Sequence, residues 1–140
     1  MLMKTVLDSC SATSPYCSND VEKSSMPHTV SLIIVNFNAG DLLEDCVSSA
    51  VHQVDEVIVV DNASTDGSVE KVEAVFSSGW KLKVVRNREN RGFAAACNIG
   101  LERSSGSCPF FLNPDCVLDP GSVERLLLAL ERYPDAGMVG

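Results

Sequence analysis

A chain of 140 residues is long enough for one domain with a substantial hydrophobic core, but not for two. Its formal net charge of −8 at pH 7 argues against a nucleic-acid-binding surface and against attraction to an anionic membrane. No apolar run approaches the roughly 20 residues that a membrane-spanning helix requires.

The first 29 residues differ in composition from the rest of the chain. They are rich in Ser and Thr, contain two Pro and show no sustained hydrophobic periodicity, so we expect residues 1–29 to be a disordered N-terminal extension. Their one apolar cluster, Met1 to Leu7, is too short for a secretory signal. The folded domain is expected to occupy residues 30–140.

The next segments alternate between short apolar runs and amphipathic patterns. Val30–Val35 predicts a buried strand because it is rich in β-branched residues. Asp41, followed three residues later by Glu44, has the spacing of a capping box and predicts the start of a helix that ends near Gln53. Val57–Val60 predicts the second strand.

A second helix and a third strand follow. The helix is predicted to end at Gly79, and its buried stripe is expected to be Val69, Val72, Val75 and Phe76. Leu82–Val85 predicts the third strand, and Lys81 and Lys83 indicate that this strand lies at the edge of the sheet.

The last units repeat the alternation. Gly92 precedes a helix of small residues from Phe93 to Leu101, in which Gly100 allows close packing on the sheet. Pro109–Leu112 predicts the fourth strand, and Asp119-Pro120 predicts the N-cap and first residue of a fourth helix that Pro134 ends. The buried face of that helix is expected to be Val123, Leu126, Leu127 and Leu130, and Ala136–Gly140 is expected to begin another strand.

Alternating strands and helices predict an α/β fold, with a mostly parallel sheet covered by helices on both faces. Right-handed crossovers then place the carboxyl ends of all strands at one edge, where ligands bind in open α/β sheets. Three polar clusters follow strands and are expected at this edge: Asn36-Phe37-Asn38, Asp61-Asn62 and Asn113-Pro114-Asp115. Each cluster taken alone is also an ordinary turn sequence.

The loop after the first strand, N-F-N-A-G, lacks the G-x-G-x-x-G pattern of dinucleotide-binding dehydrogenases, and the chain has no Walker P-loop. Phosphates at this edge would therefore be held by something other than a glycine-rich loop. A divalent cation on carboxylates is the obvious substitute, because Mg²⁺ and similar ions bridge carboxylate and phosphate oxygens.

The six cysteines do not indicate a metal or disulfide scaffold. None forms a C-x-x-C pair and the chain has two His, so a zinc site is not expected. Cys46 and Cys97 lie in apolar helical patterns and are interpreted as buried thiols. This cysteine usage predicts a reducing, cytoplasmic setting.

Four motifs in order and spacing resemble family 2 glycosyltransferases of the GT-A fold, a Rossmann-like fold, and in particular their rhamnosyltransferase-like branch. They are S-L-I-I-V-N-F-N, V-I-V-V-D-N-A-S-T-D-G-S, N-R-G-F-A-A-A-C-N-I-G and F-F-L-N-P-D-C, and the resemblance runs from about Val30 to Gly140. The resemblance implies the donor-binding part of such a domain, with the sheet ending after the fourth strand–helix unit.

The resemblance also implies roles for single residues. Phe37 would lie against the base of a nucleotide-sugar donor, with backbone at Val35 and Asn36 nearby. Asp61 and Asn62 would bind base and ribose. Three further residues complete the implied set: Gly92 and Asn98 would border the nucleoside, and Asn113 would stand in the place of the first acid of the family's D-x-D motif.

Asp115, the second acid of that motif, would be the carboxylate linked to Mg²⁺ or Mn²⁺. The implied reaction moves a sugar, with inversion, from a nucleotide-diphosphate donor to a saccharide or lipid-linked acceptor in surface polysaccharide synthesis. The implied location is the cytoplasm, with peripheral association at the inner face of the cell membrane as a further candidate. No residue matches the family's catalytic base, which is expected beyond Gly140.

Two other classes of protein remain alternatives at this point. A non-catalytic, truncated nucleotide-binding module would carry the same motifs without turning over a substrate. A phospho-receiver-like domain with Asp61 as the phosphorylated acid would need an acidic pair after the first strand, where Asn36 and Asn38 stand instead.

Overall fold

The structure, a computed structural model, describes residues 28–76 and 79–140. The expected disordered extension lies, up to residue 27, outside the described residues. The described part forms a parallel sheet of four strands in the order β3-β2-β1-β4. The strands are β1 (Val30–Asn36), β2 (Glu56–Asp61), β3 (Leu82–Arg86) and β4 (Cys108–Leu112).

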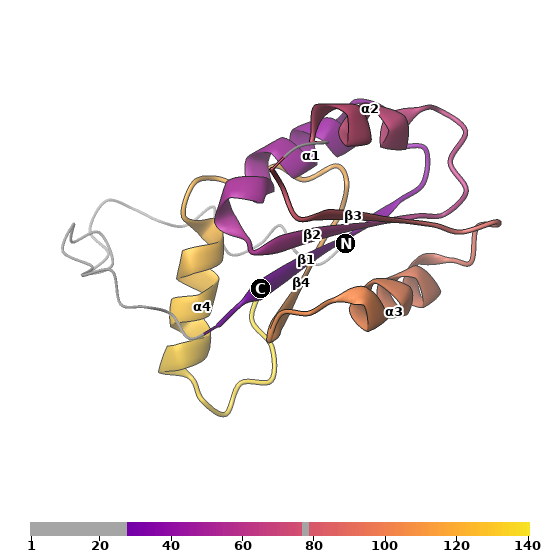
Figure 1. Cartoon of the computed structure of the whole chain (residues 1–140). Helices are drawn as coiled ribbons and strands as arrows, with labels where there is room; N and C mark the ends of the chain where they lie inside the picture. Colours follow the sequence, from indigo (N-terminus) through magenta and orange to yellow (C-terminus); the bar gives the residue numbers. More distant parts are fainter. Residues whose placement is uncertain (1–27, 77–78) are drawn as a thin grey trace.

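Helices connect the strands in the alternation expected from the sequence (Figure 1). They are α1 (Leu42–Ala50) with one 3₁₀ turn η1 (Val51–Gln53), α2 (Ser68–Val75), α3 (Phe93–Arg103) and α4 (Ser122–Arg132). The predicted α/β class, the parallel sheet and the edge position of the third strand are confirmed. Among the described residues, no helix combines the length and apolar character needed to cross a membrane.

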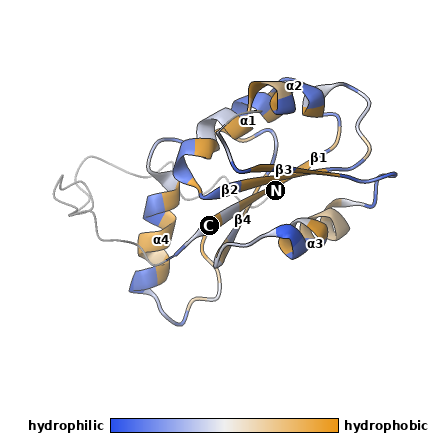
Figure 2. Ribbon diagram, in the orientation of Figure 1, coloured by the Kyte–Doolittle hydropathy of each residue, from blue (hydrophilic) through white to orange (hydrophobic). Residues whose placement is uncertain are grey.

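Helices cover both faces of the sheet. Helices α1 and α2 pack on one face and α3 on the other, while α4 lies beside the end of the sheet at which β1 begins (Figure 1). The α1/α2 side contains the larger apolar core, with Leu32, Ile34 and Val59 from the sheet against Leu43 and Val47 of α1. Figure 2 shows the alternation of hydrophobic and hydrophilic residues along the helices that this arrangement requires.

Helix α3 lies close to the sheet, as its small residues predict. A Cβ atom added at Gly100 would lie 2.4 Å from Cγ2 of Ile33 and 3.2 Å from Cγ2 of Val60. Both of these valine and isoleucine methyl groups belong to the two central strands, so a glycine is required for this approach.

Three helix ends differ from the expectations. The Asp41 side chain makes no capping hydrogen bond and instead pairs with Lys71 of α2, so the predicted capping box does not form. Helix α4 begins at Ser122, after Gly121 at φ 77°, and not at Asp119-Pro120. Helix α2 also follows a left-handed glycine, Gly67 at φ 77°, and in both places the sequence continues Gly-Ser-Val-Glu. A left-handed glycine turns the chain into the helix here, which displaces the start from the preceding acid.

Two further expectations are wrong. Helix α2 ends at Val75, before Gly79, and Val75 is 55% exposed, so it does not belong to the buried stripe expected for this helix. Ala136–Gly140 forms no strand, and Met138 is 86% exposed, because no neighbouring strand pairs with this segment.

Candidate functional site

The three polar clusters follow three neighbouring strands, β2, β1 and β4, at their carboxyl ends. Parallel register places Asn36 directly beside Asp61 on β2, and Ile34 of β1 beside Leu112, the residue before Asn113. The chain runs outward from β1 to β3 and then crosses back to β4 on the other side of β1. This reversal of strand order is where open α/β sheets form a ligand-binding crevice.

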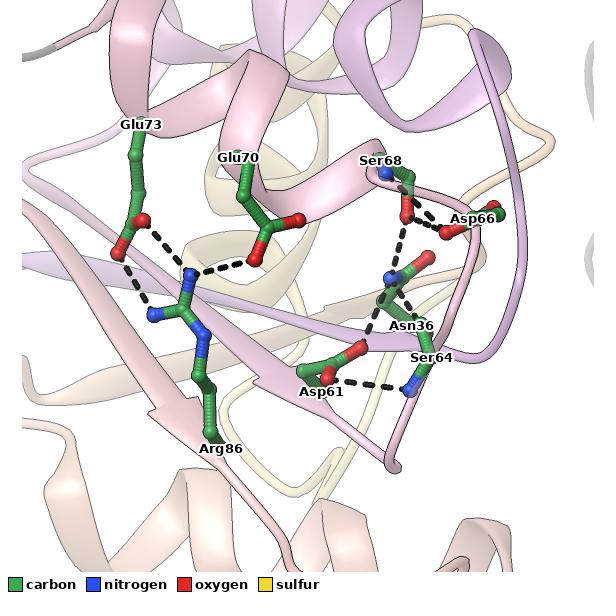
Figure 3. A network of polar contacts seen from close by, with 8 residues as sticks. All are labelled: Asn36, Asp61, Ser64, Asp66, Ser68, Glu70, Glu73 and Arg86. Atoms are coloured by element: carbon green, nitrogen blue, oxygen red, sulfur yellow. Dashed lines mark hydrogen bonds and ion pairs between the residues drawn. The ribbon is translucent and has the colours of Figure 1, made fainter.

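Asn36 is the centre of the polar network at this edge (Figure 3). Its side chain is fully buried, and its Nδ2 lies 3.0 Å from Oδ1 of Asp61, 3.0 Å from Oγ of Ser64 and 2.9 Å from Oγ of Ser68. Its Oδ1 atom is buried without a hydrogen-bond partner among the described residues. An unpaired buried acceptor costs roughly 1–3 kcal/mol. The hydrogen bonds that the Nδ2 group donates therefore hold the amide in this orientation.

Asp61 and Asn62 are buried and make internal hydrogen bonds. Asp61 is 5% exposed, and its Oδ2 accepts from the backbone N–H of Ser64 at 3.2 Å. Asn62 is 2% exposed, donates to the carbonyl oxygen of Gly92 at 3.3 Å and accepts from Asn87 Nδ2 at 2.8 Å. These bonds fix the end of β2 against the loop that leads into α3. A direct contact of either side chain with a ligand stays a prediction.

The loops after β1 and β2 are joined by side-chain hydrogen bonds. The backbone N–H of Asn38 donates to Ser64 Oγ at 2.9 Å, and that of Thr65 donates to Asn38 Oδ1 at 2.8 Å. Asn38 itself has a positive φ of 52°, which asparagine tolerates better than most residues. This pairing is not among the expectations from the sequence, although Asn38 and the Ser64-Thr65-Asp66 segment are residue types that form side-chain turn contacts.

Asp66 also connects the loops after β1 and β2, through Gly40 and Ser68. Its Oδ2 accepts from the backbone N–H of Gly40 at 2.7 Å, and its Oδ1 accepts from the Ser68 hydroxyl at 2.7 Å and the Ser68 N–H at 3.1 Å. The Ser68 hydroxyl bond is the main reason why the pKa of Asp66 lies below its ordinary value. Asp66 therefore stabilises the start of α2 as an ionised carboxylate.

Phe37 is an exposed aromatic residue at this edge. It follows the last residue of β1 and is 51% exposed, whereas Val35 is buried within the strand. Gly92, at φ 82°, is brought to Asn62 by the hydrogen bond described above. Asn98 is exposed on α3, six residues beyond Gly92 and so about 9 Å further along the helix axis. The structure thus joins Gly92, but not Asn98, to the polar network.

The loop after β4 is anchored from α1. The carbonyl oxygen of Asn113 accepts from the Cys46 thiol at 3.4 Å and from the backbone N–H of Cys116 at 3.1 Å. Burial, and then the nearby Cys116 and Asp115, raise the pKa of the Cys46 thiol to about 12, so it stays protonated and can donate. The interpretation of Cys46 as a buried thiol is confirmed. Cys97 is partly buried, not fully buried as expected, and this burial also raises its pKa.

The residues of this loop can hold a divalent cation only together with oxygen atoms of a bound ligand, such as a diphosphate. Among the described residues, no group of three or more His, Cys, Asp or Glu side chains is arranged to hold a metal ion. Asp115 offers one exposed carboxylate beside the exposed amide of Asn113. Mg²⁺ is commonly held by one or two carboxylates together with substrate phosphates, and Asp115 matches the protein's share of such a site.

The amino ends of the strands carry a second polar cluster around Glu56. Its Oε1 accepts from the Ser31 hydroxyl at 2.5 Å and from the Ser105 N–H at 2.6 Å, and its Oε2 accepts from Lys83 at 2.7 Å. Burial alone would raise the pKa of Glu56, but these hydrogen bonds, that of Lys83 foremost, lower it to about 2. A shallow pocket beside this cluster is lined by Thr29, Asp55, Lys81 and Gly106. Because both carboxylate oxygens of Glu56 already accept hydrogen bonds from the protein, we interpret this cluster as structural.

The parallel sheet with helices on both faces, and the polar clusters at the carboxyl ends of its strands, define an α/β protein of the GT-A type. Its candidate site lies at these carboxyl ends. The sequence profile of Glycosyl transferase family 2 matches residues 31–140, and the chain belongs to this family. The chain spans about a third of the length of the curated relatives that it matches, for example 33% of an uncharacterized glycosyltransferase of Haemophilus influenzae at 29% identity.

Named relatives and solved structures agree with the family. The putative teichuronic acid biosynthesis glycosyltransferase TuaG of Bacillus subtilis is 38% identical over 101 residues, covering 70% of this chain and 40% of TuaG. The mannosyltransferase PcManGT of Pyrobaculum calidifontis, solved with GDP-Man and Mn²⁺, superposes at TM-score 0.63 and 26% identity, over 81% of this chain and 34% of that one. Residues 1–349 of TarS from S. aureus, solved with UDP-GlcNAc, share the fold at TM-score 0.67 and 22% identity, over 76% of this chain and 32% of that one.

Proposed function

We propose that this chain forms the donor-binding part of a glycosyltransferase that moves a sugar from a nucleotide-diphosphate donor to a saccharide or lipid-linked acceptor. The observation that carries the proposal is the convergence of the β1, β2 and β4 polar clusters at the point where the strand order reverses. The matches to TuaG, whose name refers to teichuronic acid biosynthesis, support a role in surface polysaccharide synthesis. The cytoplasm, at the inner face of the cell membrane, is the location where such donors and lipid-linked acceptors would meet.

In this proposal the nucleoside lies between the ends of β1 and β2. Phe37, half exposed at the end of β1, would stack on the base, with backbone at Val35 and Asn36 beside it. The Asp61-Asn62 segment would contact base and ribose, and Gly92, bound to Asn62, would border the nucleoside. Asn98 would contribute from the exposed side of α3 only if the donor extends along that helix.

The diphosphate lies toward β4 in the same proposal. Asp115 would share a Mg²⁺ or Mn²⁺ ion with the diphosphate, and Asn113 would contact the diphosphate from the adjacent position. The ion, when bound, neutralises charge that grows on the departing nucleoside diphosphate. A GT-A structure with GDP-Man and Mn²⁺, that of PcManGT, supports the choice of cation. We propose inversion at the anomeric carbon and assign no catalytic base within this chain.

Nucleotide binding by the 140-residue chain tests the proposal directly. Calorimetry with UDP, GDP and dTDP should show binding of at least one, and Mn²⁺ should strengthen it because the diphosphate and Asp115 share the ion. Asp115→Asn should remove most of this Mn²⁺ effect, about 10-fold in Kd, and leave nucleotide binding without metal nearly unchanged. Asp135→Asn, an exposed acid after α4, is the matched control and should behave like the parent chain.

Absence of binding by all three nucleotides to a folded sample would refute the proposal. An equal Mn²⁺ effect in the parent chain and in Asp115→Asn would refute the assigned metal ligand alone. A non-catalytic nucleotide-binding module predicts the same calorimetry, so sugar transfer by the purified chain separates that alternative from an active enzyme.

A further inference from the structure

We infer that Asn36 is a positioning residue: its buried side-chain amide sets the orientation of the Asp61 carboxylate and of the loop that carries Ser64, and through them the nucleoside end of the site. The inference rests on the proposed function for its effect on binding. It adds a side-chain role to the backbone contact that the sequence suggests for this position, since the Asn36 side chain is fully buried.

The orientation of the amide is dictated by its neighbours. Nδ2 has two N–H groups and lies within 3.0 Å of three oxygens, those of Asp61, Ser64 and Ser68, while Oδ1 has no partner in the described part of the chain. Turning the amide over would bring Oδ1 within 3.0 Å of a carboxylate oxygen that cannot donate. Asp61 therefore holds the donor side of the amide toward itself, and the unpaired Oδ1 is the consequence.

The contacts of Asn36 continue outward to the exposed edge. Ser64 Oγ accepts from Asn36 Nδ2 and also from the backbone N–H of Asn38, the residue that follows Phe37. Asp61 Oδ2 in turn accepts from the Ser64 N–H. One buried amide thus connects the ends of both strands and the Ser64 loop (Figure 3). Through Ser64 it also reaches the backbone of Asn38, the residue after the exposed Phe37.

An aspartate at position 36 would keep the shape of the side chain and reverse its chemistry. It would replace the two N–H donors by a carboxylate oxygen about 3 Å from Asp61. Two carboxylates this close cannot both ionise easily and take up a shared proton as the pH falls, which restores an O–H donor between them. The other charged groups nearby are Asp66, bound to Ser68, and Arg86, which lies beside Asp61 in the sheet and is bound to two glutamates of α2.

The test compares Asn36→Asp, Asn36→Ala and a matched control in the 140-residue chain. Ser31→Ala is the control, because Ser31 is also fully buried on β1 and also binds a β2 carboxylate, that of Glu56 at the opposite end. The affinity for the best-bound of UDP, GDP and dTDP is measured without metal at pH 7.5 and pH 5.0. Protection of the Asn38 and Ser64 amides from hydrogen exchange is measured on the same samples without nucleotide.

We expect Asn36→Asp to bind about 10-fold more weakly than the parent chain at pH 7.5 and to recover to within about 3-fold at pH 5.0. Asn36→Ala should be weak at both pH values, and Ser31→Ala should stay within about 2-fold of the parent at both. The Asn38 and Ser64 amides should exchange about 10-fold faster in both Asn36 variants and unchanged in the control. If neither Asn36 variant folds, Ser68→Ala, which removes one of the three acceptors and leaves the hydrogen bonds of the Asn38 and Ser64 amides in place, should show the same changes at about a third of the size.

Three results overturn the inference: parent-like affinity of both Asn36 variants, loss of affinity in the Ser31 control equal to that in the variants, or unchanged exchange of the loop amides. A parent chain that binds no nucleotide refutes the proposed function instead. The hydrogen-exchange comparison then still decides whether Asn36 sets the conformation of the loop.

Discussion

Residues on β1 bind the carboxylates at both ends of β2. At one end Asn36 binds Asp61, and at the other the Ser31 hydroxyl binds Glu56, while Lys83 completes the Glu56 pair from β3. At the Glu56 end these bonds stabilise the charged form of the buried acid, which would otherwise be penalised by loss of water. The two ends differ in what surrounds them: the Glu56 end is closed by Ser105, and the Asp61 end opens onto loops.

Glu56→Gln tests the stabilising role of the closed end. The pKa of Glu56, about 2, lies below its ordinary 4.5, so its ionised form contributes stability that is present above about pH 4.5 and lost as the pH falls toward 2. At pH 7 we expect the variant to lose about 2 kcal/mol of unfolding free energy, a moderate figure because Lys83 is half exposed.

Urea denaturation between pH 7 and pH 2 gives the measurement. The difference between parent chain and variant should shrink below about pH 4.5 and vanish near pH 2. Glu102→Gln, an exposed acid on α3, serves as the control and should differ little from the parent at any pH. A difference that stays constant across this range would contradict the stated role of Glu56.

At this scale the sequence predicted where polar residues gather, but not what they bind. Asp61 and Asn62 were correctly placed at a strand end, yet both are buried and hydrogen-bonded within the protein. The partner of Asp61 lies 25 residues earlier in the chain and is fixed only by the register of β1 and β2. Side-chain partners that depend on strand register cannot be derived from local pattern.

At the scale of the elements, hydrophobic periodicity predicts where the strands and helices lie, but it does not predict the residues at which the helices begin and end. Apolar strands and amphipathic helices occur where the pattern predicts them. Helices α2 and α4, however, begin after the left-handed glycines Gly67 and Gly121. Asp66 still accepts from the first residue of α2, whereas α4 does not begin at Asp119-Pro120. The predicted fifth strand is absent, since a strand needs a partner as well as a pattern.

Gly100→Ala tests the close packing of α3 on the sheet. Alanine gains about 1 kcal/mol in helix propensity over glycine, but its Cβ would meet Ile33 at 2.4 Å on a stiff, β-branched side chain of the central strand. Overpacking of this kind costs typically 1–3 kcal/mol, so we expect a net loss of about 1 kcal/mol and a lower Tm.

Thermal denaturation of the variant and of a control decides the point. Gly137→Ala places its Cβ in open space and should leave Tm within the error of the parent chain. A stabilised Gly100→Ala variant would show that α3 can move away from the sheet without loss, contrary to the packing described.

At the scale of the whole molecule, strand order determines where a ligand can bind. The order β3-β2-β1-β4 places the ends of β2, β1 and β4 next to one another. The chain adds β2 and β3 on one side of β1 and then adds β4 on the other side. The alternation of elements and the handedness of crossovers predicted that the carboxyl ends of the strands share one edge, but not the order of the strands. The family resemblance added the assignment of residues to roles. The same arrangement puts the Glu56 cluster at the opposite edge of the sheet, which gives an internal reference for any binding experiment.

Paramagnetic broadening by Mn²⁺ in the presence of UDP, GDP or dTDP, followed residue by residue in the ¹⁵N-labelled chain, tests the central claim most directly. Broadening should centre on residues 113–116 and extend to residues 36–38 and 61–64, whereas Ser31, Glu56 and Ser105 at the other edge should keep sharp signals. Broadening centred on the Glu56 edge, or none at any residue with all three nucleotides, would contradict the account.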